Sequence, residues 1–228
     1  PPVSHVVDLG CGPGESTVLL AEVCRPAVLT GLDASPAHVE RARRRVPRAS
    51  FAVHDVTAPL PVRGADLLYA RLVLAHLPDP LTVVAGWRRQ VGPEGIVVIE
   101  DLEAIEAPAG VLRDYDALSA TVVGAGGGPM YAGRELAPLG GRLVDVTVDA
   151  AVAARIYRVN VAAWRADPAF DAGTLDALAA GLDRLVDGEP SPPVTWVVRQ
   201  LVLCGAKGSD GSAEPSEQRQ SALRPPRR

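Results

Sequence analysis

The segment VVDLGCGPGEST, residues 6 to 17, has the clearest chemical signature in the chain, because Gly10, Gly12 and Gly14 alternate with other residues. An apolar, β-branched run precedes these glycines and a helical pattern follows them, so they occupy a turn between a strand and a helix. Without side chains, such a turn lets a ligand approach the backbone, and the start of the helix offers free N–H groups. The sequence therefore predicts a ligand cradle at this turn.

The spacing and charge of this turn narrow the class of ligand. Its Gly-x-Gly-x-Gly pattern differs from the G-x-G-x-x-G of dinucleotide folds and from the GK[ST] loop of phosphate binders. Asp8 precedes the turn and Glu15 follows it. Carboxylates repel a pyrophosphate but suit a ligand that carries an ammonium group. The turn therefore favours a positively charged nucleoside over a nucleotide, and it disfavours a nicotinamide oxidoreductase.

Two further acids end predicted strands. Asp33 ends a strand at 27–33, nineteen residues after Gly14, and an acid near this offset accepts hydrogen bonds from ribose hydroxyls. Asp55 ends a strand at 49–55, where a carboxylate can accept a hydrogen bond from an adenine amine. Either acid alone could be a helix or turn cap. Because both acids, and Asp8, lie at carboxyl ends of successive strands, we expect them at the sheet edge where open α/β folds bind ligands.

The elements that must position these acids alternate along the chain. Apolar runs predict strands at 3–10, 27–33, 49–55, 64–72, 95–101, 141–149 and 194–206. Helical periodicity predicts helices at 15–24, 35–46, 81–91, 108–126, 134–140 and 174–188. Ser35 and Pro36 suit the N-cap and first position of the second helix. The alternation of strands and helices predicts an α/β fold with a doubly wound parallel sheet.

Composition excludes several classes of protein. The 228 residues suffice for one sizeable α/β domain, and 47% are apolar. A net charge of −4 provides no basic field to attract nucleic acid. No apolar run is long enough to span a membrane, and no basic-then-apolar signal opens the chain. Cys11, Cys24 and Cys204 lie far apart, which predicts neither a metal site nor a disulfide framework and indicates a cytoplasmic protein.

Four motifs in succession resemble those of class I S-adenosylmethionine-dependent methyltransferases, in particular the small-molecule branch. They are VVDLGCGPGEST, TGLDASP, FAVHDVTAPLP and ADLLYARLVLAHLPDP, and the resemblance runs from Val6 to about Asp101. The later half resembles this branch through GGGPMYAGRELAPLGG and WVVRQLVLCGA. The resemblance implies a Rossmann-like, three-layer fold whose seven-stranded sheet is mostly parallel with an antiparallel last strand. It also implies S-adenosyl-L-methionine as the cofactor.

The resemblance assigns parts of the cofactor to successive strand ends. The first strand end and glycine loop face the methionine part, Asp33 holds the ribose, and Asp55 receives the adenine amine. The side chain of Cys11 is expected only to fill the tight turn. In chain order, the implied cofactor-binding residues are Asp8, Gly10, Cys11, Gly12, Gly14, Asp33, Ala34, Asp55, Val56, Arg71 and Leu72.

Methyl transfer is an in-line displacement at a sulfonium, so the protein mainly aligns the reactants. A base is needed only if the acceptor must lose a proton. His76 is the best titratable candidate, although local packing is the role we favour for it. Glu100, with Asp101, ends a predicted strand and could orient an amine or hydroxyl acceptor. Tyr131 and Arg134 are expected either to form part of an acceptor lid or to shape a turn.

We therefore predict a methyltransferase domain at 1–206, with an acceptor or lid insert at about 102–140 and a disordered tail at 207–228. The N-terminal lid helix usual in the family is expected to be absent. The predicted activity is methylation of an O or N atom of a small molecule, without a metal or a nucleic-acid partner. A homodimer is the assembly that we expect. A cofactor-binding protein without methyl transfer and a nucleic-acid methyltransferase are the alternatives to this activity. The acidic net charge and the sequence ARLV, where a [DNS]PPY loop would stand, count against the last of these.

Overall fold

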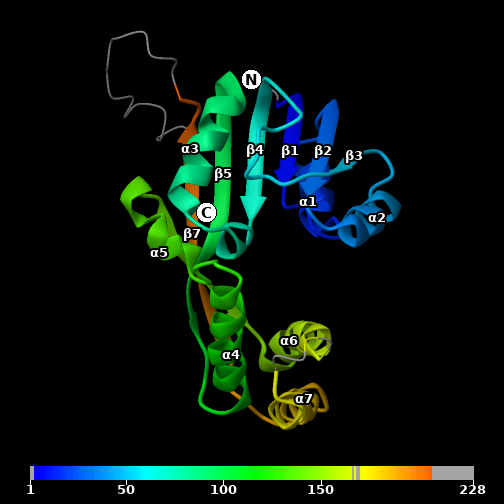
Figure 1. Cartoon of the computed structure of the whole chain (residues 1–228), viewed down its shortest axis with the longest axis vertical. Helices are drawn as coiled ribbons and strands as arrows, with labels where there is room; N and C mark the ends of the chain where they lie inside the picture. Colours follow the sequence, from blue (N-terminus) through cyan, green and yellow to red (C-terminus); the bar gives the residue numbers. More distant parts are fainter. Residues whose placement is uncertain (1–2, 166, 168–169, 207–228) are drawn as a thin grey trace, which may run out of the picture.

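The computed structural model describes residues 3–165, 167 and 170–206. The predicted disordered tail at 207–228 lies outside the described residues. The described chain forms a seven-stranded sheet in the order β3-β2-β1-β4-β5-β7-β6 (Figure 1). The strands are β1 (His5–Leu9), β2 (Val28–Asp33), β3 (Ser50–Val53), β4 (Ala65–Arg71), β5 (Val91–Glu106), β6 (Arg142–Val148) and β7 (Val194–Cys204). Neighbouring strands from β3 to β5 are parallel, and β7 is antiparallel to both β5 and β6, which confirms the predicted fold class.

Helices cover the two faces of the β1 to β5 part of the sheet. Helix α1 packs through Leu20 and Ala21 on one face, against Val6 and Tyr69. Helix α3 packs through Val84 and Trp87 on the other face, in the largest apolar cluster. The helices are α1 (Glu15–Val23), α2 (Pro36–Arg45), η1 (Leu74–His76), α3 (Pro80–Gln90), α4 (Val111–Ala125), α5 (Ala132–Glu135), η2 (Ala137–Leu139), α6 (Ala150–Trp164) and α7 (Ala172–Val186). Ser35 caps α2 as predicted, since its side chain accepts from the His38 N–H.

A second core lies beyond the carboxyl ends of the strands. Helices α4, α6 and α7 gather there around the extended ends of β5 and β7 (Figure 1). Tyr115 and Tyr157 stack at its centre, with ring centroids 3.8 Å apart, and both are buried. We call α4, α6 and α7 the helical lobe. The predicted acceptor or lid insert at about 102–140 contains α4 of this lobe, whereas α6 and α7 lie after it in the chain.

The structure differs from the predicted elements at two strand ends and in one additional helix. Strand β5 continues to Glu106, since antiparallel β7 pairs with it through a register shift between Leu102 and Ala104. Strand β3 ends at Val53, before a turn at Asp55. Helix α6 is absent from the predicted elements, because apolar residues surround this helix and obscure its period. No helix in the described part of the chain is long and apolar enough to cross a membrane.

Candidate cofactor and acceptor site

The glycine turn is built from left-handed backbone, with φ values of +65° at Gly10, +52° at Gly12 and +95° at Gly14. A hydrogen bond of 3.0 Å from the Cys11 N–H to the Leu32 carbonyl ties the turn to the end of β2. A Cβ at Gly10 would meet Cγ2 of Val73 at 2.4 Å, whereas a Cβ at Gly12 would meet nothing within 4 Å. Gly10 is therefore required for packing, and the open side of the turn lies at Gly12. The Cys11 side chain is buried, which agrees with a filling role.

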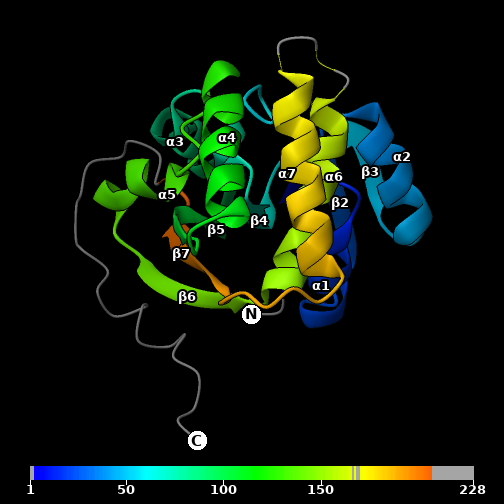
Figure 2. The ribbon, with the colours of Figure 1, turned by 90° about the horizontal axis from the view of Figure 1, so that it is seen from below.

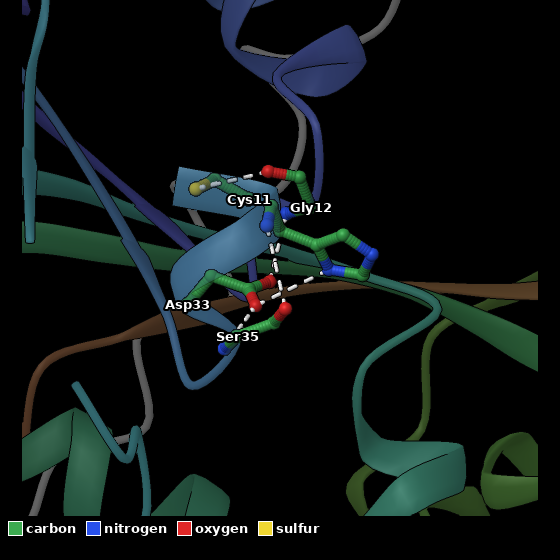
Figure 3. A network of polar contacts seen from close by, with 5 residues as sticks. Cys11, Gly12, Asp33 and Ser35 are labelled. Atoms are coloured by element: carbon green, nitrogen blue, oxygen red, sulfur yellow. Dashed lines mark hydrogen bonds and ion pairs between the residues drawn. The ribbon is translucent and has the colours of Figure 1, made fainter. Parts of the chain in front are cut away.

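Asp33, at the end of β2, faces the glycine turn (Figure 3). One carboxylate oxygen accepts from the Gly12 N–H at 2.9 Å and the other accepts from the Ser35 N–H at 2.8 Å. His38 Nδ1 lies 3.4 Å from the latter oxygen. A carboxylate has about four acceptor positions, so Asp33 retains acceptor capacity beside the open side of the turn. Its 13% exposed side chain is thus placed to meet a ligand hydroxyl, and Ala34 beside it is exposed.

Asp8 lies beneath the turn and is only 1% exposed. Its Oδ2 accepts from the hydroxyls of Ser16 at 2.7 Å and Thr17 at 2.6 Å, which fastens β1 to the first turn of α1. Its Oδ1 is buried without a hydrogen-bond partner among the described residues. Burial, opposed by the two hydroxyls, raises the pKa of Asp8 to about 6. Contact of Asp8 with a ligand ammonium group stays a prediction, and in this structure the carboxylate joins strand to helix.

Asp55 and Val56 differ in their surroundings. Asp55 is exposed two residues beyond β3, and its carboxylate accepts from both the N–H and the hydroxyl of Thr57. These hydrogen bonds lower the pKa of Asp55. Val56 is buried in the core, and its carbonyl accepts from Trp87 Nε1 at 2.8 Å. The Val56 side chain therefore packs against α3, and contact of Val56 with the cofactor stays a prediction.

The loop after β4 is held by a buried acid. Leu72 adopts a left-handed φ of +55°, and its N–H donates to the Glu100 carbonyl at 2.9 Å. The Asp101 carboxylate accepts from the N–H groups of Leu74 and Leu102 at 2.9 and 3.0 Å. Burial raises the pKa of Asp101 to about 6, against the lowering effect of the backbone hydrogen bonds. Asp101 was predicted at a strand end facing an acceptor, and the structure instead buries it where it positions the loop after β4.

Glu100 lies inside β5 and not at a strand end, contrary to the prediction. Its two oxygens accept from the hydroxyl of Tyr69 at 2.8 Å and from Nε2 of Gln200 at 2.5 Å. Arg71, which is exposed at the end of β4, approaches the same carboxylate at 3.8 Å. Because side chains from both neighbouring strands, β4 and β7, satisfy this carboxylate, a direct role of Glu100 on an acceptor is not supported by its geometry.

His76 ends the short helix η1 and is exposed. The backbone of the 126–131 loop lies close to it, since a Cβ at Gly128 would clash with the Ala75 carbonyl oxygen. Desolvation lowers the pKa of His76, so the imidazole is neutral at pH 7. No hydrogen bond or ion pair fixes its side chain within the described part of the chain. The residue is thus available beside the loop after β4, and its role in catalysis stays a prediction.

Tyr131 and Arg134 form one unit with a residue that the motifs did not reveal, Asp116 of α4. The Tyr131 hydroxyl contacts both Asp116 oxygens at 2.7 and 2.8 Å. The Arg134 guanidinium lies 4.5 Å from the centroid of the Tyr131 ring, and its Nε donates to the Glu103 carbonyl. This unit joins α4, α5 and β5. Only the fold brings Asp116 to Tyr131, so spacing along the chain carried no signal for it.

The described residues contain no group of three or more His, Cys, Asp or Glu side chains that could hold a metal ion.

A model of a protein family described as a methyltransferase domain matches residues 7–99. That range runs from β1 into β5 and includes the glycine turn, Asp33 and the loop after β4. Over these residues the chain is similar to a methyltransferase domain.

Curated relatives of this methyltransferase domain match part of the chain. The trans-aconitate 2-methyltransferase of Methylobacterium radiotolerans is 40% identical over 128 residues, which cover 56% of this chain and 49% of the relative. The trans-aconitate 2-methyltransferase of Escherichia coli K12 is 37% identical over 98 residues, covering 43% and 39%. The chain thus spans about half the length, or less, of the curated relatives it matches.

A solved methyltransferase shares the fold over most of the chain. Haemonchus contortus phosphoethanolamine N-methyltransferase 2, in complex with S-adenosyl-L-methionine, has a TM-score of 0.54 and 16% identity. The likeness covers 89% of this chain and 49% of that chain. At this identity it shows the fold alone.

S-adenosyl-L-methionine is the methyl donor of class I methyltransferases, and the residues present fit it. The turn is open at Gly12, where a Cβ would meet nothing. Asp33 beside it has acceptor capacity for ribose hydroxyls. Asp8 adds a buried carboxylate beneath the turn. This edge of the sheet therefore presents an open turn and two carboxylates, which suit a cationic nucleoside.

Proposed function

We propose that this chain transfers a methyl group from S-adenosyl-L-methionine to an O or N atom of a small molecule. The observation that carries the proposal is the joining of Asp33 to the open glycine turn, at the strand edge where α/β folds bind ligands. The domain match over residues 7–99 supports the same reaction class.

In this proposal, the residues of the chain bind and align the reactants. Asp33 would accept hydrogen bonds from the ribose, and the backbone at Gly12 would lie against the methionine part. Asp101 would hold the loop after β4 in place, since its carboxylate fixes the Leu74 N–H. When bound, the cofactor supplies an activated methyl group on sulfur, so alignment and exclusion of water account for most of the rate. His76, neutral at pH 7, is the only group that we propose could receive an acceptor proton.

A carboxylate oxygen is the acceptor to test first, because the curated relatives are trans-aconitate 2-methyltransferases. An acidic carboxyl group is already ionised at pH 7 and needs no base. A cytoplasmic location belongs to the same proposal, since the three cysteines are free. A homodimer remains a prediction that sedimentation velocity tests.

The experiment has a binding arm and a transfer arm. Calorimetry of the full chain should show binding of S-adenosylhomocysteine and none of NADH at the same concentration. Transfer of a tritiated methyl group to a panel of small carboxylic acids and amines, compared with DNA and RNA, then identifies the acceptor class. Binding without transfer to any acceptor would favour the alternative of a cofactor-binding protein, and transfer to nucleic acid would contradict the proposal.

A further inference from the structure

Helix α6 is apolar on two opposite sides. Ala153, Tyr157 and Val161 face the second core, and each is at most 3% exposed. On the opposite side, Val152, Ile156 and Val159 are 43%, 44% and 69% exposed. Their spacing of four and three residues places them in one row along the helix. We call these three residues the α6 stripe.

A helix that is apolar on two opposite sides is normally covered on both of them. A contiguous exposed apolar row on a folded domain commonly marks a binding surface. In the described part of the chain, α6 packs against α7 and, to a smaller extent, α4, through its other face. The stripe therefore needs an occupant that the described chain does not supply.

The position of α6 in the fold indicates which kind of ligand the α6 stripe would bind. Figures 1 and 2 together place α6 between α7 and the carboxyl edge of β1 and β2. Because the buried face of α6 packs on α7, the stripe faces away from α7, toward the edge that carries Gly12 and Asp33. A small molecule on the stripe would thus lie beside the proposed methyl donor.

One cation accompanies the stripe. Arg155 is exposed, and no hydrogen bond or ion pair joins it to another residue in the described chain, whereas Arg158 pairs with Asp183 at 2.6 Å. A guanidinium with unused N–H groups suits a carboxylate or another oxyanion. An apolar surface with one polar group beside it is the usual composition of a small-molecule site.

We propose that the α6 stripe binds the apolar body of the methyl acceptor and that Arg155 binds an acid group on it. The acceptor class is then an amphipathic organic acid. This inference rests on the proposed function. It also distinguishes the acceptor from trans-aconitate, which has three carboxylates and no extended apolar part. The family match ends at residue 99, before α6, so it leaves the acceptor side undetermined.

The test uses the full chain saturated with S-adenosylhomocysteine and the probe 8-anilinonaphthalene-1-sulfonate, which joins apolar rings to one sulfonate. We expect a saturable rise in fluorescence that dodecanoate reverses and trans-aconitate at the same concentration does not. The double variant Val152→Thr/Val159→Thr should weaken probe binding about tenfold, because two apolar contacts become polar. Arg155→Gln should also weaken it. The matched control is Val23→Thr, since Val23 is a helical valine that is 72% exposed on α1, and it should leave probe binding unchanged.

The outcomes separate this inference from the proposed function. Equal probe affinity in the wild type, the double variant and the control would overturn the inference. A wild-type dimer that the double variant converts to a monomer, in sedimentation velocity, would also overturn it, because a second copy would then cover the stripe. Failure of the wild type to bind S-adenosylhomocysteine would instead reject the proposed function. The α6 variants themselves should bind S-adenosylhomocysteine as the wild type does.

Discussion

The backbone N–H of Gly12 donates a hydrogen bond of 2.9 Å to the carboxylate of Asp33, twenty-one residues further along the chain (Figure 3). This bond joins the glycine turn after β1 to the end of β2. It means that one side chain both orders the turn and stands beside its open face. Substitution of Asp33 is therefore expected to affect two measurable quantities, the affinity for the cofactor and the stability of the fold.

Asp33→Ala should weaken binding of S-adenosylhomocysteine by about 1.5–3 kcal/mol, the range for lost charge-assisted hydrogen bonds. It should also lower the free energy of unfolding by about 1–2 kcal/mol, because the N–H groups of Gly12 and Ser35 lose their acceptor. Calorimetry and urea denaturation measure the two effects. Asp66→Ala is the control, since Asp66 also accepts from two backbone N–H groups, those of Ser4 and His5, but at the other edge of the sheet. An unchanged dissociation constant for Asp33→Ala would show that Asp33 does not hold the ribose.

Gly10→Ala and Gly12→Ala should differ in their main effect, on stability for the first and on cofactor binding for the second. Both positions have positive φ, so each alanine costs about 1–2 kcal/mol in backbone strain. At Gly10 the new Cβ also clashes with Val73, so this variant should be the less stable of the two. At Gly12 the Cβ enters open space, so we expect a folded variant with at least about tenfold weaker cofactor binding. Thermal unfolding and calorimetry on both variants decide this, and full affinity in folded Gly12→Ala would mean that the ligand does not approach this backbone.

Asp8 and Asp101 should make the fold less stable as the pH rises from 4 to above 6. Each pKa is raised to about 6 from 3.8, so the native state binds more protons than the unfolded state between about pH 4 and pH 6. Their contribution to the free energy of unfolding is therefore present at pH 4 and is lost as the pH rises through 6. Asp8→Asn should remove the part of this loss that Asp8 causes, about 2–3 kcal/mol. The free energy of unfolding of the variant should therefore rise relative to that of the wild type between pH 4.5 and pH 7.5.

The comparison of Asp8→Asn with Asp101→Asn provides the control. An asparagine at position 8 keeps one oxygen for the hydroxyls of Ser16 and Thr17. At position 101 both oxygens accept from backbone N–H groups, so an amide NH₂ would face a donor, and Asp101→Asn should be destabilising at every pH. Urea denaturation at the two pH values measures both variants. A constant difference between Asp8→Asn and the wild type would show that Asp8 does not titrate in this range.

His76→Gln should leave turnover within a few-fold of the wild type once an acceptor is known. The imidazole has no fixed partner in the described structure, and a sulfonium methyl donor needs alignment more than a base. NMR titration should place the pKa of His76 below 6.5, because desolvation disfavours the charged form. A loss of turnover of about a hundredfold or more, in a stably folded variant, would make His76 the general base. Equal affinity for S-adenosylhomocysteine in both proteins checks that the cofactor site is intact.

Local patterns in the sequence were sufficient to predict the sheet and the place of Asp33 at the end of β2. The glycines at positions 10, 12 and 14 mark a turn between a strand and a helix, and the structure has a left-handed turn there. Asp33 follows a β-branched run, so its place at the end of β2 depends only on neighbouring residues. The capping of α2 by Ser35 is local in the same sense. Such features depend on backbone sterics and short-range hydrogen bonds, which a sequence displays directly.

The tertiary structure alone decided the environment of the acids and the arrangement of the helical lobe. Asp8 and Asp101 are buried because α1 and the loop after β4 close over them, and Glu100 is satisfied because β4 and β7 lie on either side of it. Helix α6 overhangs the cofactor edge because the ends of β5 and β7 extend beyond the sheet to support the helical lobe. Each of these facts depends on contacts between residues up to a hundred positions apart. Burial and long-range pairing are properties of the packed chain, so no local pattern of residue types could specify them.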